Sequence, residues 1–297
     1  MPELTLQGTV IRGIGSFYTV RTAEGEEYTL RAQKKIRRTR VSPLPGDEVL
    51  FFPPRDGEQG WIGGVLPRKT LCLRPPVANV ETLVVVMAPE PEPDLLLTDR
   101  QIARAYAQGM KVLLAVNKCD TDGGELARRL AEEYAASGAR VFPVSALEGT
   151  GLEPLKEAMR GSLCCFSGQS GAGKSTLINA LLDLSRETGG LSRKIARGKN
   201  TTRSAELLEK DGVRVMDSAG FSLLEPEKDL PPEELKNRYP EFQPYEGKCR
   251  FRQCLHDSEP GCAAAEAVRA GAVHPARWQR YRVLLAEARE NWKNRYD

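Results

Sequence analysis

The sequence predicts a multidomain chain with an N-terminal OB-fold β-barrel, a central α/β domain and a small, mostly helical C-terminal unit. Three observations predict this division. Five short β-rich segments fill the first 66 residues, strand and helix patterns then alternate to about residue 216, and Cys and His gather between residues 249 and 262. We place the three parts at residues 1–68, 69–224 and 225–297.

Composition and charge exclude several classes of protein. The 297 residues carry a formal net charge of +3, so an affinity for polyanions has to come from local patches. No apolar run approaches the ~18 residues of a membrane span, and the N-terminus lacks the basic and apolar regions of a signal peptide. Seven cysteines, an odd number, do not suit a disulfide framework. We therefore expect a soluble, cytoplasmic protein without a membrane partner.

The first 66 residues consist of short strand patterns separated by Gly and Pro. Five such segments without helical periodicity favour a small barrel of the OB-fold type. Residues 31–40 hold six Lys and Arg. This segment is either a solvated loop or a patch that follows nucleic-acid phosphates, and we favour the phosphate patch. The predicted strands are residues 4–11, 16–20, 27–31, 48–52 and 61–66.

The central region alternates buried strand patterns with helical ones. Such alternation predicts a mostly parallel sheet with helices on its faces, and ligands then bind at the carboxyl ends of the strands. Two further strand patterns flank a Lys-Asp-Gly turn. The predicted strands are 82–88, 111–116, 140–144, 162–167, 206–209 and 213–216, and the predicted helices are 95–108, 125–137, 152–160 and 175–182.

A phosphate-binding loop lies between the fourth of these strands and the helix after it. The sequence Gly168-Gln-Ser-Gly-Ala-Gly-Lys-Ser175 fits the P-loop pattern G-x-x-x-x-G-K-[ST]. A chance Gly-rich turn would not have a buried strand before it and a helix after it. Backbone N–H groups would hold phosphates, Lys174 would reach the β- and γ-phosphates, and Ser175 would bind Mg²⁺. The predicted nucleotide-binding residues here are Gly168, Gln169, Ser170, Gly171, Ala172, Gly173, Lys174, Ser175 and Thr176.

Two later segments complete a triphosphate site. Asp217 ends a strand and is followed by Gly220, so the carboxylate can hold Mg²⁺ through water and the glycine N–H can sense the γ-phosphate. Asp-x-x-Gly alone is usually only a turn, but its position at a strand end after a P-loop makes it good evidence for a phosphate site. Between the two motifs, Thr202 is the threonine we expect to close over Mg²⁺ and the γ-phosphate.

The base preference follows from Asn117-Lys118-Cys119-Asp120, at the end of another strand. The Asp120 carboxylate would accept hydrogen bonds from guanine N1–H and the exocyclic amine, a donor pattern that adenine lacks. Asn117 would tie this loop to the phosphate site, and the stem of Lys118 would cover the base. The backbone of Ser145 and Ala146 would donate to guanine O6. Together these matches favour GTP and GDP over ATP.

The motifs are in a circularly permuted order. The base-reading segments at 117–120 and 145–146 precede the P-loop, whereas ordinary small GTPases have the phosphate motifs first. The same sheet survives such a change when the old chain ends lie near each other. The γ-phosphate sensor around Gly220 then continues directly into the C-terminal unit, so the nucleotide state is expected to act on that unit.

The C-terminal unit contains Cys249, Cys254, His256 and Cys262 within 14 residues. Three thiolates and one imidazole form a closed tetrahedral set that suits structural Zn²⁺. Free buried cysteines are the simpler alternative, and catalytic zinc is disfavoured because no open coordination position remains. In the final helix we expect Arg277 and Arg280, with Arg282 and Lys293, either to be solvated or to contact RNA.

The permuted motifs, the barrel before them and the Cys/His unit after them resemble the circularly permuted, ribosome small-subunit-dependent GTPases of bacteria. The resemblance covers essentially the whole chain. It implies an OB-fold, a permuted GTPase domain and a zinc domain that act late in assembly of the small ribosomal subunit. We expect the chain to be a monomer that contacts the rRNA of that subunit. This chain has Asn200 where the family has a histidine, and Asp217-Ser-Ala-Gly220 where the family has Asp-Thr-Pro-Gly.

No residue is an evident general base for hydrolysis. Phe221 stands where many GTPases have a water-orienting Gln, and Asn200 can bond water but does not act as a base near neutral pH. We therefore expect low intrinsic activity that the small subunit stimulates, coupled to release. One alternative is an RNA-binding assembly factor that uses GTP as a conformational ligand with negligible turnover, and a more distant one is a metal-delivery GTPase.

Overall fold

A computed structural model describes residues 5–33, 42–55, 57–73, 76–184, 205–217 and 230–295. The chain forms two compact units. The first comprises Met1–Leu83, Lys156–Ser167 and Ile178–Ser222, and the second comprises Val84–Leu155, Gly168–Leu177 and Leu223–Asp297. The limits at residues 68 and 224 stay a prediction. None of the helices in the described ranges combines the length and apolar character that a membrane span requires.

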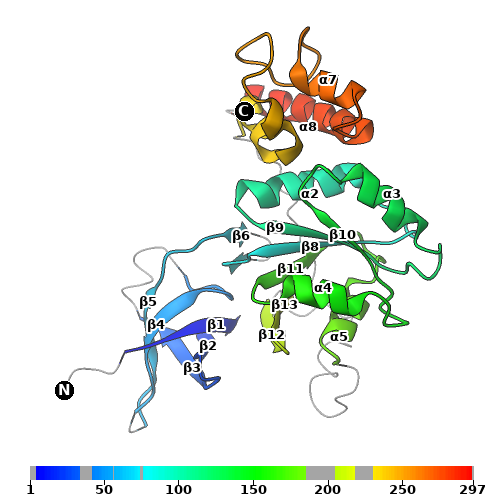
Figure 1. Ribbon diagram of the computed structural model, residues 1–297. Helices are drawn as coiled ribbons and strands as arrows, with labels where there is room; N and C mark the ends of the chain where they lie inside the picture. The colour runs from blue at the N-terminus through cyan, green and yellow to red at the C-terminus, as the bar shows by residue number, and fades with distance from the viewer. Residues whose placement is uncertain are drawn as a thin grey trace. The chain divides into compact units, whose positions relative to one another are not determined.

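The first unit contains the predicted five-stranded barrel (Figure 1). Its strands follow the order β1-β2-β3-β5-β4, and β4 pairs back with β1, which closes the barrel. Alternate side chains point inward and form one small apolar core of Val10, Val20, Leu30, Val49, Phe51 and Ile62. The strands are β1 (Leu6–Ile14), β2 (Phe17–Arg21), β3 (Glu27–Ala32), β4 (Glu48–Phe52) and β5 (Trp61–Val65).

The same unit continues the barrel into three more strands. β12 pairs with β1 through Arg12 and Glu206, β13 pairs antiparallel with β12, and β11 runs parallel to β13. A small hairpin that the sequence did not predict follows the last barrel strand in the chain. These strands are β11 (Leu163–Ser167), β12 (Glu206–Lys210) and β13 (Val213–Asp217), and the hairpin is β6 (Leu71–Leu73) with β7 (Pro76–Ala78).

The second unit holds the base-reading half of the α/β domain. Its strands follow the order β10-β9-β8, and β9 and β10 are parallel. Every residue of β8 is buried, as its continuous apolar sequence predicts. The elements are α2 (Leu95–Ala107), β9 (Lys111–Val116), α3 (Glu125–Glu133) and β10 (Arg140–Pro143). Three further elements each run from one unit into the other: β8 (Thr82–Met87), α4 (Leu152–Met159) and the P-loop helix α5 (Lys174–Leu181).

The C-terminal part of the second unit is helical, as predicted. Short 3₁₀ turns precede two α-helices, and Figure 1 shows α8 lying along α2. An aromatic group of Tyr239, Phe242 and Tyr281 forms the centre, with ring centroids 4.8–5.4 Å apart. The elements are η1 (Pro232–Arg238), η2 (Pro240–Tyr245), α7 (Ala263–Arg269) and α8 (Pro275–Lys293).

A buried ionic network joins α8 to α2. The Arg277 side chain is 2% exposed, and its guanidinium donates to Glu241 at 2.7 and 2.9 Å and to Asp99, which is itself fully buried. Arg280 donates to Asp99 at 2.6 Å. The rings of Tyr134 and Tyr239 lie 4.8 and 4.9 Å from the Arg277 guanidinium. The expectation of a solvated or RNA-contacting face is therefore wrong for these two arginines, because carboxylates from distant segments neutralise them.

We expect Arg277→Ala to destabilise the protein by about 3–5 kcal/mol, because it leaves Asp99 and Glu241 as buried charges without their partner. Urea unfolding followed by circular dichroism measures the change in midpoint. Arg269→Ala is the matched control, since the Arg269 side chain is 73% exposed and its Glu266 partner is 3.9 Å away. Equal midpoints for the two variants would contradict the assigned role of the network.

Candidate active site and metal centre

One buried side chain joins the predicted base-reading loop to the phosphate loop. Asn117 follows β9, and its amide Nδ2 donates to the carbonyl of Ala172 at 3.0 Å. Its Oδ1 accepts the backbone N–H of Ala146 at 3.0 Å. Asn117 is 3% exposed, its bond to Ala172 is buried and its bond to Ala146 is partly buried. Three segments that are up to 55 residues apart thus share one side chain as their common support.

Lys118 adds a second connection. Its ammonium donates to the carbonyl of Gly171 at 2.9 Å and to that of Glu90 at 2.7 Å, which fixes the loop after β8 against the P-loop. The Lys118 backbone has φ of +60°, a left-handed conformation that turns the chain sharply after Asn117. Its aliphatic stem is therefore held beside the P-loop, where the sequence analysis expects the base to lie.

Two P-loop glycines are required by close contacts. A Cβ on Gly168 would lie 2.1 Å from the carbonyl oxygen of Val86, and a Cβ on Gly173 would lie 2.4 Å from Nδ2 of Asn117. Both residues also have positive φ, at +129° and +88°. Only glycine fits such positions without displacing the backbone or the Asn117 amide. The loop is therefore shaped for its contacts with β8 and Asn117.

The start of α5 presents the groups that the sequence predicts to bind phosphate. Lys174 is the first residue of the helix, and its ammonium donates to the carbonyls of Gly168 and Gln169 at 2.6 and 2.7 Å. Partial burial lowers the pKa of Lys174. Ser175 and Thr176 are exposed at the helix N-terminus, as are Ser170 and Gly171 in the loop. Free N–H groups and the helix dipole favour an anion at this end.

Asp120 is exposed on the loop after β9, as a residue that contacts a ligand has to be. The N–H groups expected to meet guanine O6 are used within the protein: that of Ser145 donates to Thr150 at 2.9 Å, and that of Ala146 donates to Asn117. The next residue, Leu147, is 87% exposed. These two bonds hold the 145–146 loop in place. A hydrogen bond to guanine O6 would therefore require the N–H of Ser145 or Ala146 to have two acceptors or to lose its present one.

Of the remaining residues predicted for the phosphate site, some lie in the described part of the chain and others lie outside it. Asp217 ends β13, as predicted, and is partly exposed. Asn200, Thr202, Gly220 and Phe221 lie outside the described residues. Their roles stay predictions from the sequence.

We expect Asn117→Ala to weaken GTP binding by about 10- to 100-fold, because loss of the shared amide leaves buried groups of Ala172 and Ala146 unpaired at about 1–3 kcal/mol each. Isothermal titration with GTP measures the effect. Asn294→Ala, an exposed substitution beyond α8, is the control. Unchanged affinity in Asn117→Ala would contradict the supporting role of this amide.

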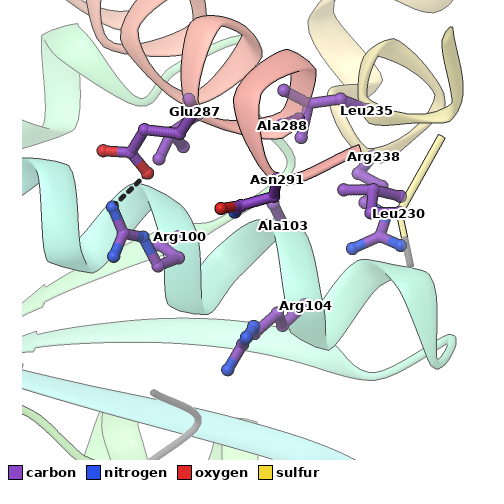
Figure 2. A pocket seen from close by; sticks show the side chains of 10 residues that line it. Arg100, Ala103, Arg104, Leu230, Leu235, Arg238, Glu287, Ala288 and Asn291 are labelled. Carbon is purple, nitrogen blue, oxygen red and sulfur yellow. Dashed lines mark hydrogen bonds and ion pairs between the residues drawn. The ribbon is translucent and has the colours of Figure 1, made fainter. Parts of the chain in front are cut away.

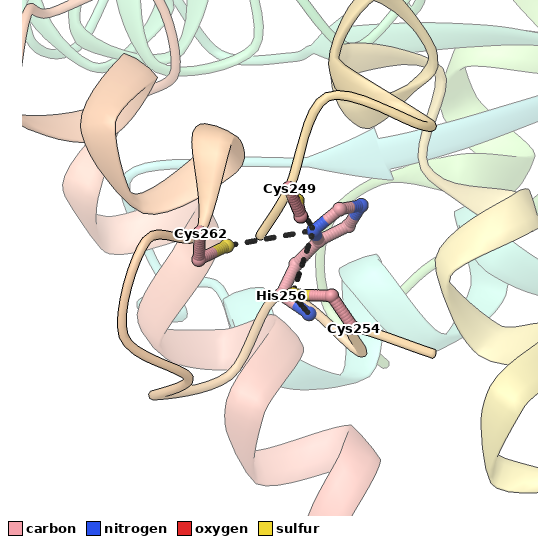
Figure 3. A group of neighbouring side chains, drawn as sticks. All are labelled: Cys249, Cys254, His256 and Cys262. Atoms are coloured by element: carbon pink, nitrogen blue, oxygen red, sulfur yellow. Dashed lines mark hydrogen bonds between the residues drawn. The ribbon is translucent and has the colours of Figure 1, made fainter. Parts of the chain in front are cut away.

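The four predicted metal ligands come together in the second unit (Figure 3). Their ligand atoms all lie within 4.8 Å of one another, and the three Sγ atoms lie 3.5–3.7 Å from Nδ1 of His256. Zn–S bonds near 2.3 Å and Zn–N bonds near 2.0 Å in a tetrahedron put sulfur and nitrogen about 3.5 Å apart. The donor set and its spacing thus fit a tetrahedral thiolate–imidazole site.

Surrounding groups orient these ligands. Nε2 of His256 lies 2.9 Å from Glu246, an acceptor that leaves Nδ1 free to bind a metal. Each sulfur accepts one backbone N–H at 3.3–3.4 Å, from residues 263, 256 and 265 for Cys249, Cys254 and Cys262. Glu259 accepts the N–H groups of residues 255 and 257 and so holds the loop around the histidine. Sequence reasoning missed Glu246 and Glu259, because acidic residues near a metal motif are common.

A further hollow in the second unit lies between α2, η1 and α8 (Figure 2). Three arginines line it, which suggests an anion. However, Arg100 pairs with Glu287 at 2.6 Å, and Arg104 and Arg238 also have interaction partners. We assign no ligand to this hollow.

Comparison with known proteins identifies the family. A protein-family model described as RsgA GTPase matches residues 65–227, and a second one, described as RsgA N-terminal domain, matches residues 7–62. A protein named small ribosomal subunit biogenesis GTPase RsgA, from Moorella thermoacetica, is 42% identical over 288 residues, which cover 95% of this chain and 97% of the relative. The chain belongs to the RsgA GTPase family. A relative of the same name from Ruminiclostridium cellulolyticum is 40% identical over 279 residues, 92% of this chain and 91% of the relative.

Solved structures agree with membership of the RsgA GTPase family. The crystal structure of YjeQ from Thermotoga maritima has a TM-score of 0.82 and 31% identity, and the comparison covers 96% of this chain and 99% of that one. The structure of YloQ, described as a circularly permuted GTPase, has a TM-score of 0.80 and 25% identity over 97% and 96% of the two chains. The predicted fold class, with an OB-like barrel and a permuted GTPase fold, is confirmed.

As an RsgA GTPase the chain hydrolyses GTP, and its family makes GTP, GDP and Mg²⁺ the expected ligands. The assignments at the P-loop, at Asn117–Asp120 and at Asp217 rest on the sequence pattern and on the contacts described above.

Proposed function

We propose that this GTPase binds the small ribosomal subunit in its GTP form during late maturation and leaves it after hydrolysis. One observation supports the proposal: the Asn117 amide bonds to both the P-loop and the 145–146 loop, so the three segments predicted to hold the nucleotide share one support. The relatives named above are small ribosomal subunit biogenesis GTPases, which supplies the partner. Work on ribosomal subunits implies the cytoplasm, and we expect the chain to act there as a monomer.

The residues divide the work of the GTP site. Asp120 selects guanine, and the N–H groups of the P-loop with Lys174 hold the phosphates. Ser175 and Thr202 would hold Mg²⁺ directly and Asp217 through water; the ion supplies charge neutralisation between the β- and γ-phosphates. Gly220 would sense the γ-phosphate. Phe221 stands in the sequence where many GTPases have a water-orienting Gln, and Asn200 is not a base near neutral pH, so no side chain of this chain is assigned as a base.

A missing base is the reason to propose that the subunit stimulates hydrolysis. A partner that orders residues 200–202 and 220–221 around the γ-phosphate would complete the site, and hydrolysis would then loosen the same segments. Because Gly220 precedes the C-terminal unit in the chain, the change can pass to that unit. Release after turnover follows from this order of events.

We also propose that Cys249, Cys254, His256 and Cys262 hold structural Zn²⁺. Support comes from the closed thiolate–imidazole set, the N–H group donated to each sulfur and the Glu246 contact with His256. A closed set favours a structural ion over a delivered one. For rRNA binding we propose the barrel, whose sequence from residue 31 to 40 carries six Lys and Arg.

Co-sedimentation with purified small subunits tests the proposal. We expect the protein to pellet with the subunit in the presence of a non-hydrolysable GTP analogue and to remain in the supernatant with GDP. Lys174→Ala, which weakens nucleotide binding, should pellet poorly in both conditions. Equal pelleting of the wild type with the analogue and with GDP would contradict nucleotide-controlled binding.

A further inference from the structure

A straight row of side chains crosses the outer surface of the barrel. Ile14 on β1 is directly opposite Phe17 on β2, which is opposite Arg31 on β3. Arg31 is in turn opposite Trp61 on β5, and Trp61 is opposite Phe52 on β4. Directly opposed residues on paired strands point to the same face. The five strands therefore place three aromatic rings, one aliphatic side chain and one guanidinium in a single line, which we call the outer row.

The outer row faces solvent. Next to it, Tyr18 is paired with Leu30, and Phe51 is paired with Ile62, and these residues belong to or pack against the barrel core. Because side chains alternate along a strand, the outer row points away from that core. Ile14, Phe17 and Trp61 are 60%, 39% and 38% exposed, so they are among the most exposed large apolar side chains of the described chain. Such a grouping marks a binding surface.

The cation in the middle of the row is placed for stacking. The Arg31 guanidinium lies 4.3 Å from the centroid of the Phe17 ring, and its strand partner on the other side is Trp61. No carboxylate in the described part of the chain forms an ion pair with Arg31. Its charge is therefore available to a negatively charged partner.

One end of the row depends on a glycine. A Cβ on Gly63 would lie 2.8 Å from Cε2 of Phe52, so the Phe52 ring covers the backbone at residue 63. The missing side chain leaves room for the ring beside Trp61. The flat aromatic surface thus extends over β5 and β4.

We propose that the outer row is a stacking platform for unpaired bases of single-stranded RNA. Nucleic-acid bases stack on aromatic rings and on guanidinium planes, and each nucleotide brings a phosphate that an unpaired arginine neutralises. The face of strands 2 and 3, which carries Phe17 and Arg31, is also where OB-folds receive oligonucleotides. RNA is favoured over a protein partner because the row combines flat rings with a cation that forms no ion pair with a described carboxylate. The inference rests on the proposed function only in choosing RNA rather than DNA as the nucleic acid.

Binding of a single-stranded RNA to the full-length protein tests the proposal. The probe is an oligonucleotide of about eight nucleotides, within the known range of site sizes, that carries 2-aminopurine, whose fluorescence falls on stacking. We expect Phe17→Ala and Trp61→Ala each to weaken binding by about 5- to 150-fold and to reduce the quenching of 2-aminopurine. Trp61→Phe should retain most of both signals.

Controls separate stacking from misfolding and from loss of charge. Leu50→Ala removes a side chain that is 38% exposed, like Trp61, from the same barrel but outside the row, and should leave binding unchanged. The ring variants should keep the salt dependence of the wild type, because they remove no phosphate contact, whereas Arg31→Gln should reduce it. Circular dichroism checks that each variant is folded.

Unchanged RNA affinity in both ring variants would overturn the platform, and so would a wild type that does not bind or quench the probe. A row that serves a protein partner instead gives the first of these results. Because this assay contains neither subunits nor nucleotide, it can fail while GTP-dependent co-sedimentation succeeds. Co-sedimentation can likewise fail while the RNA assay succeeds. The two experiments therefore test the two proposals independently.

Discussion

Asp120→Asn is expected to change the base preference from GTP to xanthosine triphosphate. In the proposed site the Asp120 carboxylate would accept hydrogen bonds from N1–H and the exocyclic amine of guanine, whereas an asparagine amide would oppose its own N–H₂ group to that amine. Xanthine has a carbonyl at this position and accepts from the amide. Sites that pair with a substrate donor reject the unpaired analogue by about 10⁴–10⁵-fold, and we expect a change of that order in the ratio of the two affinities.

Competitive titration with a fluorescent GTP analogue, displaced by each nucleotide, measures this ratio. Asp122→Asn is the matched control: its carboxylate caps α3 by accepting the N–H groups of Gly124 and Leu126 at 2.9 Å, which an asparagine oxygen can also do in part. Its base preference should not change. If Asp120→Asn keeps the wild-type preference for GTP, the loop after β9 does not read the base.

Cys254→Ser is expected to abolish metal binding at the proposed zinc site and to unfold the C-terminal part of the second unit. Structural zinc contributes on the order of 10 kcal/mol to small metal-dependent domains, which is comparable with the whole stability of a domain. The metal content should fall from one equivalent to none. Trp278 should report the change in fluorescence, because its indole N–H donates to the carbonyl of His256 at 2.7 Å and would lose that partner.

Metal analysis after dialysis and the Trp emission maximum provide the two measurements. Cys119→Ser is the control, since Cys119 is partly exposed and its thiol lies outside the cluster. Burial, followed by the neighbouring Asp120 and Asp122 carboxylates, raises the pKa of Cys119, so this thiol stays neutral and is a poor metal ligand. A Cys254→Ser protein that retains stoichiometric metal would contradict the site.

Local patterns made much of this molecule predictable. The strand before Asn117 and the one before Gly168 have continuous apolar sequences, and glycines at 168 and 173 are required by contacts with Val86 and Asn117 that a P-loop pattern already implies. The metal ligands were found because they are close in sequence. The two bonds of Asn117 were predictable only in outline: its link to the P-loop was expected, while its bond to Ala146 was not.

Contacts between distant segments were not predictable. Arg277 meets Asp99, 178 residues away, and Glu241, 36 residues away, and no local pattern pairs these charges. One signal was present: Arg277 shares the buried face of α8 with Tyr281 and Leu285, at helical spacing. An arginine on an apolar helix face indicates a buried partner. The outer row could not be predicted either, because the order and register of the strands decide that Phe17 lies opposite Arg31 and Arg31 opposite Trp61.

Single-turnover GTP hydrolysis, with and without purified small ribosomal subunits, tests the central claim most directly. Because Phe221 stands where many GTPases have a water-orienting Gln and Asn200 is not a base near neutral pH, the chain should hydrolyse GTP slowly alone. The subunit should accelerate the step on the order of 10²–10³-fold. Lys174→Ala should be slow in both conditions. Rapid hydrolysis by the isolated protein that added subunits leave unchanged would contradict the account.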